Sequence, residues 1–382
     1  MIKHLLFTSA FVSLGICFAL DASAQTNPAS SPPIAATVDA AKKFLATLDE
    51  AGRGKVVYDF KDEAQRKRWS NLPTSFVKRG GLRMGDLTQP QRDAAMAVVA
   101  AALSAQGYEK VVEIVEGDEM LKKNDNGGGP RRGGPGGPNP AERPDLTPPG
   151  GNTGGGPPNG GGPRGPGGPG GPAMFGRDNY YISFVGQPSA TEPWMMQFGG
   201  HHLGINVTFV GEHATLAPSH TGSQPAIYEV EGKTVRPLGG ESDKAYTLLQ
   251  ALDDTQRKQA ILGAKMHDLV LGPGRDGQMI QPEGLKGSEL TDKQREMLLD
   301  LIGEWVGIQN NVVAKAKMEE VKTNLAETWF AWSGPTEKGA AAYFRIQGPT
   351  VLIEYAPQTL GGDPTKHIHT IYRDPTNDYG VK

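Results

Sequence analysis

Apolar and polar residues alternate along much of the second half of the chain, and this period of two predicts β-strands. The N-terminal third and two central segments instead carry apolar residues at helical spacing. Strands flank a helical block without regular strand–helix alternation. This order predicts the α+β class, a mixed, mainly antiparallel β-sheet packed with several α-helices. The clearest strand segments are YYISFVG (180–186), WMMQFGG (194–200), HHLGINVTFV (201–210), AAYFRIQ (341–347), VLIEYA (351–356) and HIHTIYRD (367–374).

Capping signals place the helices. We expect a first helix from near Thr37, a strand in GKVVYDF (54–60), a long alanine-rich helix from Thr88 that ends near Gly107, and helices around 242–263 and 291–322. The phrase Leu-Thr/Asp-x-x-Gln-Arg begins at residues 87, 252 and 290, each time ahead of a helical pattern. Recurring cap chemistry explains this phrase, and an ancient duplication is the alternative.

The first 24 residues have the pattern of a secretory signal: Lys3, an apolar run from Leu5 to Leu20, and Ala22-Ser23-Ala24 as a cleavage site. We therefore expect a periplasmic or secreted protein cleaved after Ala24. The run is too short for a confident transmembrane span, and no stable membrane span is expected after its removal.

The mature chain is expected to be a flexible leader (25–36) followed by one α+β domain (37–382). A Gly/Pro-rich insert at about 124–175 interrupts that domain. Glycine and proline are concentrated there, without the strict period of collagen, so the insert is expected to be disordered.

Charge and cysteine content exclude several functions. The net charge of −3 does not indicate nucleic-acid binding, and no nucleotide cofactor is expected. Cys17, the only cysteine, lies in the signal, so the mature chain can form neither a disulfide nor a thiolate site. Any metal ion must be held by His, Asp, Glu or Met.

The H-x-H pair near the C-terminus is one candidate for metal binding. On an extended chain His367, His369, Ile371 and Arg373 share one face, and residues two apart on a strand lie about 7 Å apart at the backbone. Two imidazoles at that spacing can converge on one ion. A strand with two solvated histidines has the same pattern, so both interpretations stay open.

The preceding strands offer a possible third group. A hairpin across Gly348-Pro349 would put Phe344 opposite Ile353 and Ile346 opposite Val351. Arg345 and Glu354 are then diagonal neighbours on the other face. They form either a plain ion pair or a site in which Glu354 is a metal ligand or general base beside the histidines.

The same period of two places the neighbouring histidines at 201 and 202 on opposite faces. On a continuous strand His201 shares its face with Leu203 and Ile205, whereas His202 shares its face with Gly204. His201 is therefore expected to be a buried, hydrogen-bonded core residue and His202 a metal ligand. A bulge at the two preceding glycines would break this register.

Three other chemistries find less support. The spacing from Gly361 to the H-x-H pair imitates a cupin motif but lacks its glutamate, and too few residues follow. Met195 and Met196 lie close to the histidine pair and suggest copper, although methionines in a core are commoner. Ser189, Ser219 and Ser333 are available, but none lies in a nucleophile motif.

Seven segments carry a family resemblance: WSNLP (69–73), RGGL (79–82), LSAQGY (103–108), YISFVGQPS (181–189), WMMQFGGHHLGIN (194–206), YFRIQGPTVLIEY (343–355) and HIHTIYRDPTNDYG (367–380). Together they resemble the family catalogued as domain of unknown function 3500, over nearly the whole mature chain. The resemblance implies one domain with the insert inside it, and no activity. The family pattern is similar at both histidine pairs, Arg345, Glu354 and Asp378, but TLGGDPTK (359–366) replaces its asparagine-rich approach to H-x-H.

The leading hypothesis is a mononuclear divalent-metal site that supports hydrolysis of an unidentified substrate, with zinc favoured over copper or iron. An exported binding protein for an anionic small ligand or surface partner is the alternative, and a purely structural cluster is a third. Arg345 and Arg373 would orient substrate, with Glu354 as the base. The expected metal ligands are His202, His367, His369, Glu354 and Asp378, with Asp374 as a further candidate.

Overall fold

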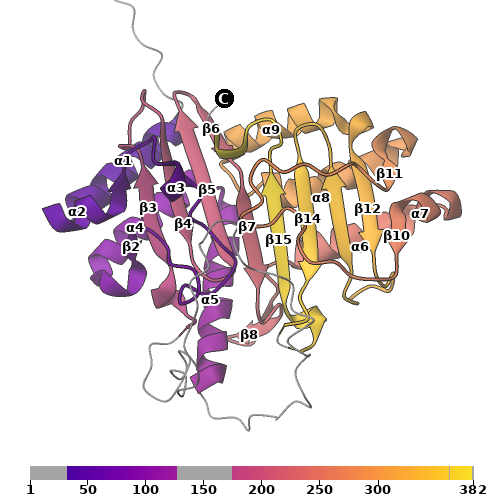
Figure 1. Cartoon of the computed structure of the whole chain (residues 1–382), viewed down its shortest axis with the longest axis horizontal. Helices are drawn as coiled ribbons and strands as arrows, with labels where there is room; N and C mark the ends of the chain where they lie inside the picture. The colour runs from indigo at the N-terminus through magenta and orange to yellow at the C-terminus, as the bar shows by residue number, and fades with distance from the viewer. Residues whose placement is uncertain (1–31, 127–173, 361, 381–382) are drawn as a thin grey trace, which may run out of the picture.

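The computed structural model describes residues 32–126, 174–360 and 362–380. The expected signal sequence and the leader up to residue 31 lie outside the described residues, as do positions 127–173 of the expected insert. The architecture of the described chain is shown in Figure 1.

One large β-sheet runs through the molecule, and nearly all of its neighbouring strands are antiparallel. Only the two outermost pairings, β1 with β3 and β10 with β12, are parallel among the described strands. The predicted α+β class is confirmed. The order across the sheet is β1 (Val57–Tyr58), β3 (Tyr181–Val185), β4 (Trp194–Gly199), β5 (Leu203–Val210), β7 (Ser219–Ser223), β15 (Ile368–Arg373), β14 (Leu352–Pro357), β13 (Tyr343–Gln347), β12 (Trp329–Ser333) and β10 (Ile261–Gly263). Short strands β2 (Leu82–Arg83), β6 (His213–Leu216) and β11 (Leu285–Lys286) pair beside this path, and β8 (Tyr228–Val230) with β9 (Lys233–Val235) forms a separate hairpin.

The helices are shorter and more divided than the sequence predicts. The alanine-rich helix ends at Ala102 rather than near Gly107, and Gly107 lies inside the next helix, where an added Cβ would meet the Ile308 carbonyl oxygen at 2.1 Å. The first helix begins at Pro32 rather than Thr37. The helices are α1 (Pro32–Ala46), α2 (Glu50–Val56), α3 (Glu63–Arg66), α4 (Gln89–Ala102), α5 (Ala105–Asn126), α6 (Gly239–Ala251), α7 (Asp254–Ala260), α8 (Asp292–Val306) and α9 (Asn311–Thr323).

The two faces of the sheet have different neighbours. Helices pack on one face (Figure 1), where the Trp305 indole of α8 donates to the Thr370 hydroxyl at 3.0 Å. Long loops at 59–81 and 264–284 cover part of the other face, where Trp69 and Leu271 pack with Leu352 and Ile371. Because side chains alternate along β15, His369 and Thr370 point to opposite faces, and His369 lies on the loop side.

The two halves of the sheet repeat the same pairings. Ile182 pairs with Phe198 in the first half, and Phe330 pairs with Ile346 in the second. Phe330 follows Ile182 by the same number of positions as Ile346 follows Phe198. Gln197 opposite Asn206 and Arg345 opposite Glu354 obey the same offset. Apart from α3, which lies between β1 and β2 and has no counterpart, the order α1-α2-β1-β2-α4-α5-β3-β4-β5 recurs as α6-α7-β10-β11-α8-α9-β12-β13-β14. This repetition supports the duplication that the recurring cap phrase left as the alternative.

The predicted β13–β14 register is wrong by two residues. Phe344 pairs with Tyr355 and Ile346 with Ile353, because the turn has four residues and is closed by a hydrogen bond from Gly348 N to Val351 O at 2.7 Å. A two-residue shift preserves the face of every side chain. It does bring Arg345 directly opposite Glu354, not diagonal to it.

Candidate metal centre

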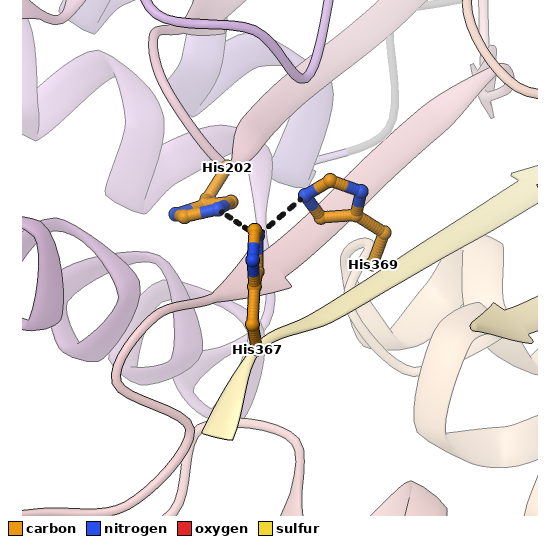
Figure 2. Close-up of side chains that lie close together, drawn as sticks. All are labelled: His202, His367 and His369. Atoms are coloured by element: carbon orange, nitrogen blue, oxygen red, sulfur yellow. Dashed lines mark hydrogen bonds between the residues drawn. The ribbon is translucent and has the colours of Figure 1, made fainter. Parts of the chain in front are cut away.

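Three histidine side chains converge at the face of the sheet that the loops cover. The Nε2 atom of His367 lies 2.9 Å from Nε2 of His202 and 3.1 Å from Nε2 of His369 (Figure 2). His369 belongs to β15 and His367 immediately precedes it, whereas His202 ends the turn between β4 and β5. All three residues are at least 95 % buried.

A tight turn aims His202 at the other two histidines. Gly200 N donates to Leu203 O at 2.9 Å, and His202 has a φ of 60°, a left-handed conformation that costs free energy for a residue with a side chain. The His202 carbonyl accepts from Gly222 N of β7 at 2.7 Å. Tertiary contacts therefore hold the strained residue in place.

The continuous strand predicted through 201 and 202 is wrong, since β5 begins only at Leu203. The left-handed residue puts both imidazoles together, with ring centroids 3.5 Å apart, instead of on opposite faces. His201 is nevertheless buried, and its Nδ1 lies 2.6 Å from Oδ1 of Asp118 in α5. This matches the expectation of a hydrogen-bonded interior histidine.

Hydrogen bonds outside the cluster orient the ligand nitrogens. Nδ1 of His367 donates to the Leu360 carbonyl at 2.7 Å, which leaves the Nε2 lone pair free in the neutral ring. Nδ1 of His369 lies 3.1 Å from the amide nitrogen Nδ2 of Asn71, which donates to it. A rotation of the Asn71 amide by 180° exchanges its nitrogen and oxygen; Nδ1 would then donate to the oxygen and leave Nε2 of His369 free to bind an ion.

Burial keeps these imidazoles neutral. It lowers the pKa of His202 and of His369 well below the ordinary value, and the neighbouring histidines lower both further. The pKa of His367 is also lowered by burial. His220, whose ring centroid lies 5.3 Å from that of His369, has its pKa lowered by burial to about 3. Neutral imidazole is the form that binds metal ions.

The spacing suits one ion. Ligand nitrogens about 2.0 Å from a tetrahedral ion are about 3.3 Å apart, so the distances of 2.9 and 3.1 Å need to open only slightly. A second group, Asp118 with His201 and His202, also has its ligand atoms within 4.8 Å of one another. These buried groups could hold a metal ion.

Glu354, which the sequence placed beside the histidines, has different partners. Its carboxylate accepts hydrogen bonds from the backbone of Val270 and Leu271 at 2.9 and 2.7 Å, and from the Tyr343 hydroxyl at 2.6 Å. Arg345 bonds to Glu283 at 2.8 Å and not to Glu354. Glu354 and Arg345 thus hold the loop 264–284 against the sheet.

Arg373 and its partners lie toward the other end of β15. Arg373 binds Asp378 at 2.6 Å and Asp276 at 3.1 Å, and donates to the carbonyls of Leu271 and Gly272. Asp374 binds Lys317 at 2.6 Å. A cavity of about 860 Å³ opens beside Arg373, lined by other residues than the three histidines. Of the ligands expected from the sequence, the structure brings together His202, His367 and His369.

Sequence reasoning missed three neighbours of the cluster. Asp118 lies in a helix rich in acidic residues, and Asn71 lies in a loop, so neither had a local signal for a site. His220 shares with His369 the local pattern of a histidine followed by threonine, and the repeat relates the two. A search for the duplication would have singled out His220.

A family model described as a protein of unknown function (DUF3500) matches residues 30–381. The chain belongs to this family. No curated protein matches the chain at a significant level, and neither does any solved structure. The family brings no activity with it, so the candidate site has to be argued from its own geometry.

In the described part of the chain, no helix is both long and apolar enough to cross a membrane.

Proposed function

We propose that this family member is an exported metalloprotein that holds a divalent ion on Nε2 of His202, His367 and His369. The convergence of these three nitrogens from opposite halves of the sheet is the observation that carries the proposal. Burial supports it further, because three neutral imidazoles provide a ligand set without competing protons.

Zinc is the ion that this ligand set favours. Imidazole nitrogen suits zinc, copper, iron and nickel, and the two distances from Nε2 of His367 are close to the separation of ligands around a tetrahedral zinc. Three protein ligands leave a fourth position open, as in catalytic zinc sites, and an ion in that state activates water for hydrolysis. We propose hydrolysis as the reaction class.

The depth of the cluster supports a second candidate, an ion that only stabilises the fold. The three ligands join the two halves of the sheet and are at least 95 % buried, as in a structural site. The notion of an anion-binding protein has less support, because both arginines expected to bind the anion are engaged by carboxylates of the chain.

Metal content of the purified mature protein tests the proposal. We expect at least about one equivalent of zinc in the wild type, and at least about one equivalent less in His202→Ala, His367→Ala and His369→Ala. The matched control is His213→Ala, since His213 is exposed in β6 and should leave the metal content unchanged. Metal-free wild type, or equal metal in all four variants, would refute the site.

Activity separates the two candidates. A hydrolytic centre predicts that the zinc-loaded protein cleaves an activated ester or phosphoester and that a chelator abolishes this cleavage. A structural ion predicts a large fall in melting temperature on chelation with no cleavage. Export is tested separately by the mass of the secreted protein, which should begin at Gln25.

A further inference from the structure

His202 lies between two groups of metal-ligating side chains. Its Nε2 faces His367, whereas its Nδ1 faces Asp118, with 3.8 Å between Nδ1 and Oδ1. His202 is 1 % exposed, and among the described residues no group lies within hydrogen-bond distance of Nδ1. A buried ring nitrogen without a partner is costly, which indicates a missing ligand on this side.

Asp118 supplies a fixed negative charge at that point. Its side chain is fully buried, and Oδ2 accepts a hydrogen bond from Gly176 N at 3.0 Å. Oδ1 is left for the two histidines, 2.6 Å from Nδ1 of His201 and 3.8 Å from Nδ1 of His202. The Phe175 ring packs on His201, with centroids 4.9 Å apart.

We propose a second metal position, formed by Asp118, Nδ1 of His201 and Nδ1 of His202, so that the His202 imidazolate bridges two divalent ions. This inference rests on the proposed function for the first ion, on Nε2 of His202. Each ion lies about 2 Å from its nitrogen of the ring, which puts the two ions about 6 Å apart.

The second ion arrives with partial compensation of its charge. The Asp118 carboxylate and the imidazolate carry two negative charges against the four positive charges of the two ions, so a net charge of +2 is left for hydroxide or another anion at the open position of the first ion. His202 gives up its ring proton to solvent. For His201 to bind through Nδ1, the proton that this nitrogen shares with Asp118 moves to Nε2 of the same ring. The short contact between His201 and Asp118 opens from 2.6 Å as the ion takes the place of the shared proton.

A hydrogen bond alone explains the geometry less well. The distance of 3.8 Å between His202 and Asp118 is beyond hydrogen-bond range, but two ligand atoms at that separation can bind one ion from either side. The three ligand atoms lie within 4.8 Å of one another without any rearrangement of the backbone.

Stoichiometry with zinc is the first test. The wild type should bind about two equivalents, Asp118→Asn about one, His367→Ala about one, and His202→Ala almost none. Asp118→Asn is the informative change because it keeps the shape of the side chain and removes the charge. Melting curves of the metal-free variants separate failure to fold from failure to bind.

Copper(II) provides an independent readout in the wild type. Two copper ions joined by an imidazolate are magnetically coupled, so the loaded protein should lose most of its signal in electron paramagnetic resonance. Asp118→Asn, with one copper left on the three histidines, should show the full signal of an isolated ion.

Each outcome decides between the two proposals. One equivalent in the wild type, kept by Asp118→Asn and lost by His367→Ala, overturns the second position and leaves the first. One equivalent that is lost by Asp118→Asn and kept by His367→Ala overturns the first position and with it the bridge. A protein that binds no metal overturns both positions. Two equivalents with uncoupled copper signals overturn the bridge.

Discussion

The hydroxyls of Thr221 and Thr370 lie 2.7 Å apart, where strands β7 and β15 join the two halves of the sheet. The pairs on either side of them are symmetric, with His369 opposite Gly222 and Ile371 opposite His220. The hydrogen bond therefore marks a pseudo-two-fold axis. The histidine cluster lies beside this axis but breaks its symmetry, because the repeat gives His202 the counterpart Thr350.

The repeat predicts equal sensitivity at two glycines, Gly81 and Gly284, which begin equivalent strands with φ of 93° and 100°. A Cβ at Gly284 would lie 2.3 Å from the Phe330 carbonyl oxygen, and one at Gly81 would lie 2.1 Å from that of Ile182. We expect either alanine variant to lower the free energy of unfolding by at least about 2 kcal/mol.

Urea unfolding measures this effect, with Gly54→Ala as the control. Gly54 is an exposed helical glycine, and a Cβ added there would meet nothing within 4 Å. Its alanine variant should therefore be neutral or more stable by up to about 1 kcal/mol. Similar losses at Gly54 and Gly284 would contradict the prediction.

Lys110 is a buried cation whose loss should destabilise the fold. It contacts Glu241 of α6 and, at 3.5 Å, Glu304 of α8; burial lowers its pKa, but the two carboxylates more than offset this and raise it. Lys110→Met leaves buried carboxylate charge unpaired, and we expect a loss of about 3–5 kcal/mol in the free energy of unfolding.

Lys244→Met is the matched control, because Lys244 also binds Glu304, at 2.7 Å, but is partly exposed. Its loss should be below about 1 kcal/mol. Equal effects of the two methionine variants in urea unfolding would show that burial does not set the cost.

Asn71 should tune the metal affinity through His369, because their contact of 3.1 Å orients the ring. We expect Asn71→Leu to weaken zinc binding about 10- to 100-fold in competition with a chelator, a range typical of groups that orient a ligand. Asn71→Asp should keep the affinity, since a carboxylate accepts from Nδ1. Unchanged affinity in Asn71→Leu would remove this residue from the site.

Glu354→Gln should leave zinc binding unchanged and loosen the loop 264–284. The fully buried carboxylate accepts hydrogen bonds from two backbone amides of this loop, and the amide variant weakens both. Limited proteolysis should cut the variant in the loop faster than the wild type. Loss of bound zinc would instead make Glu354 a ligand, as the sequence pattern suggested.

His220 should make the metal-free protein sensitive to acid. Its pKa is about 3 in the folded state, below the ordinary value of 6.5, because burial disfavours the charged ring. Above pH 6.5 both states are neutral and the full stability is present. As the pH falls below 6.5 the unfolded state takes up the proton first, so stability is lost until the pH reaches the folded pKa.

We expect this one histidine to remove about 2–3 kcal/mol of the free energy of unfolding between pH 7 and pH 4.5. His220→Gln isolates it, since the variant should lose that much less over the same range in urea unfolding of the metal-free protein. Parallel pH curves for the two proteins would show that His220 is protonated in the folded state.

The sequence by itself determined the class of the fold and the local chemistry. Alternation located the strands, and the absence of cysteine after Cys17 restricted any metal site in the described chain to His, Asp, Glu and Met. Even where the β13–β14 register was two residues off, the period of two still assigned Phe344 and Ile346 to one face. These properties depend only on residues near in sequence, where periodicity and side-chain type carry the information.

Only the tertiary structure decided which residues meet. His202 and His367 are 165 positions apart, and the contact depends on a left-handed residue that β7 holds in place and on the pairing of the two halves. Asp118 reaches the site from a helix without any local signal, and Glu354 instead accepts hydrogen bonds from the backbone of the loop 264–284. Such encounters are fixed by the packing of distant segments, which local periodicity does not encode.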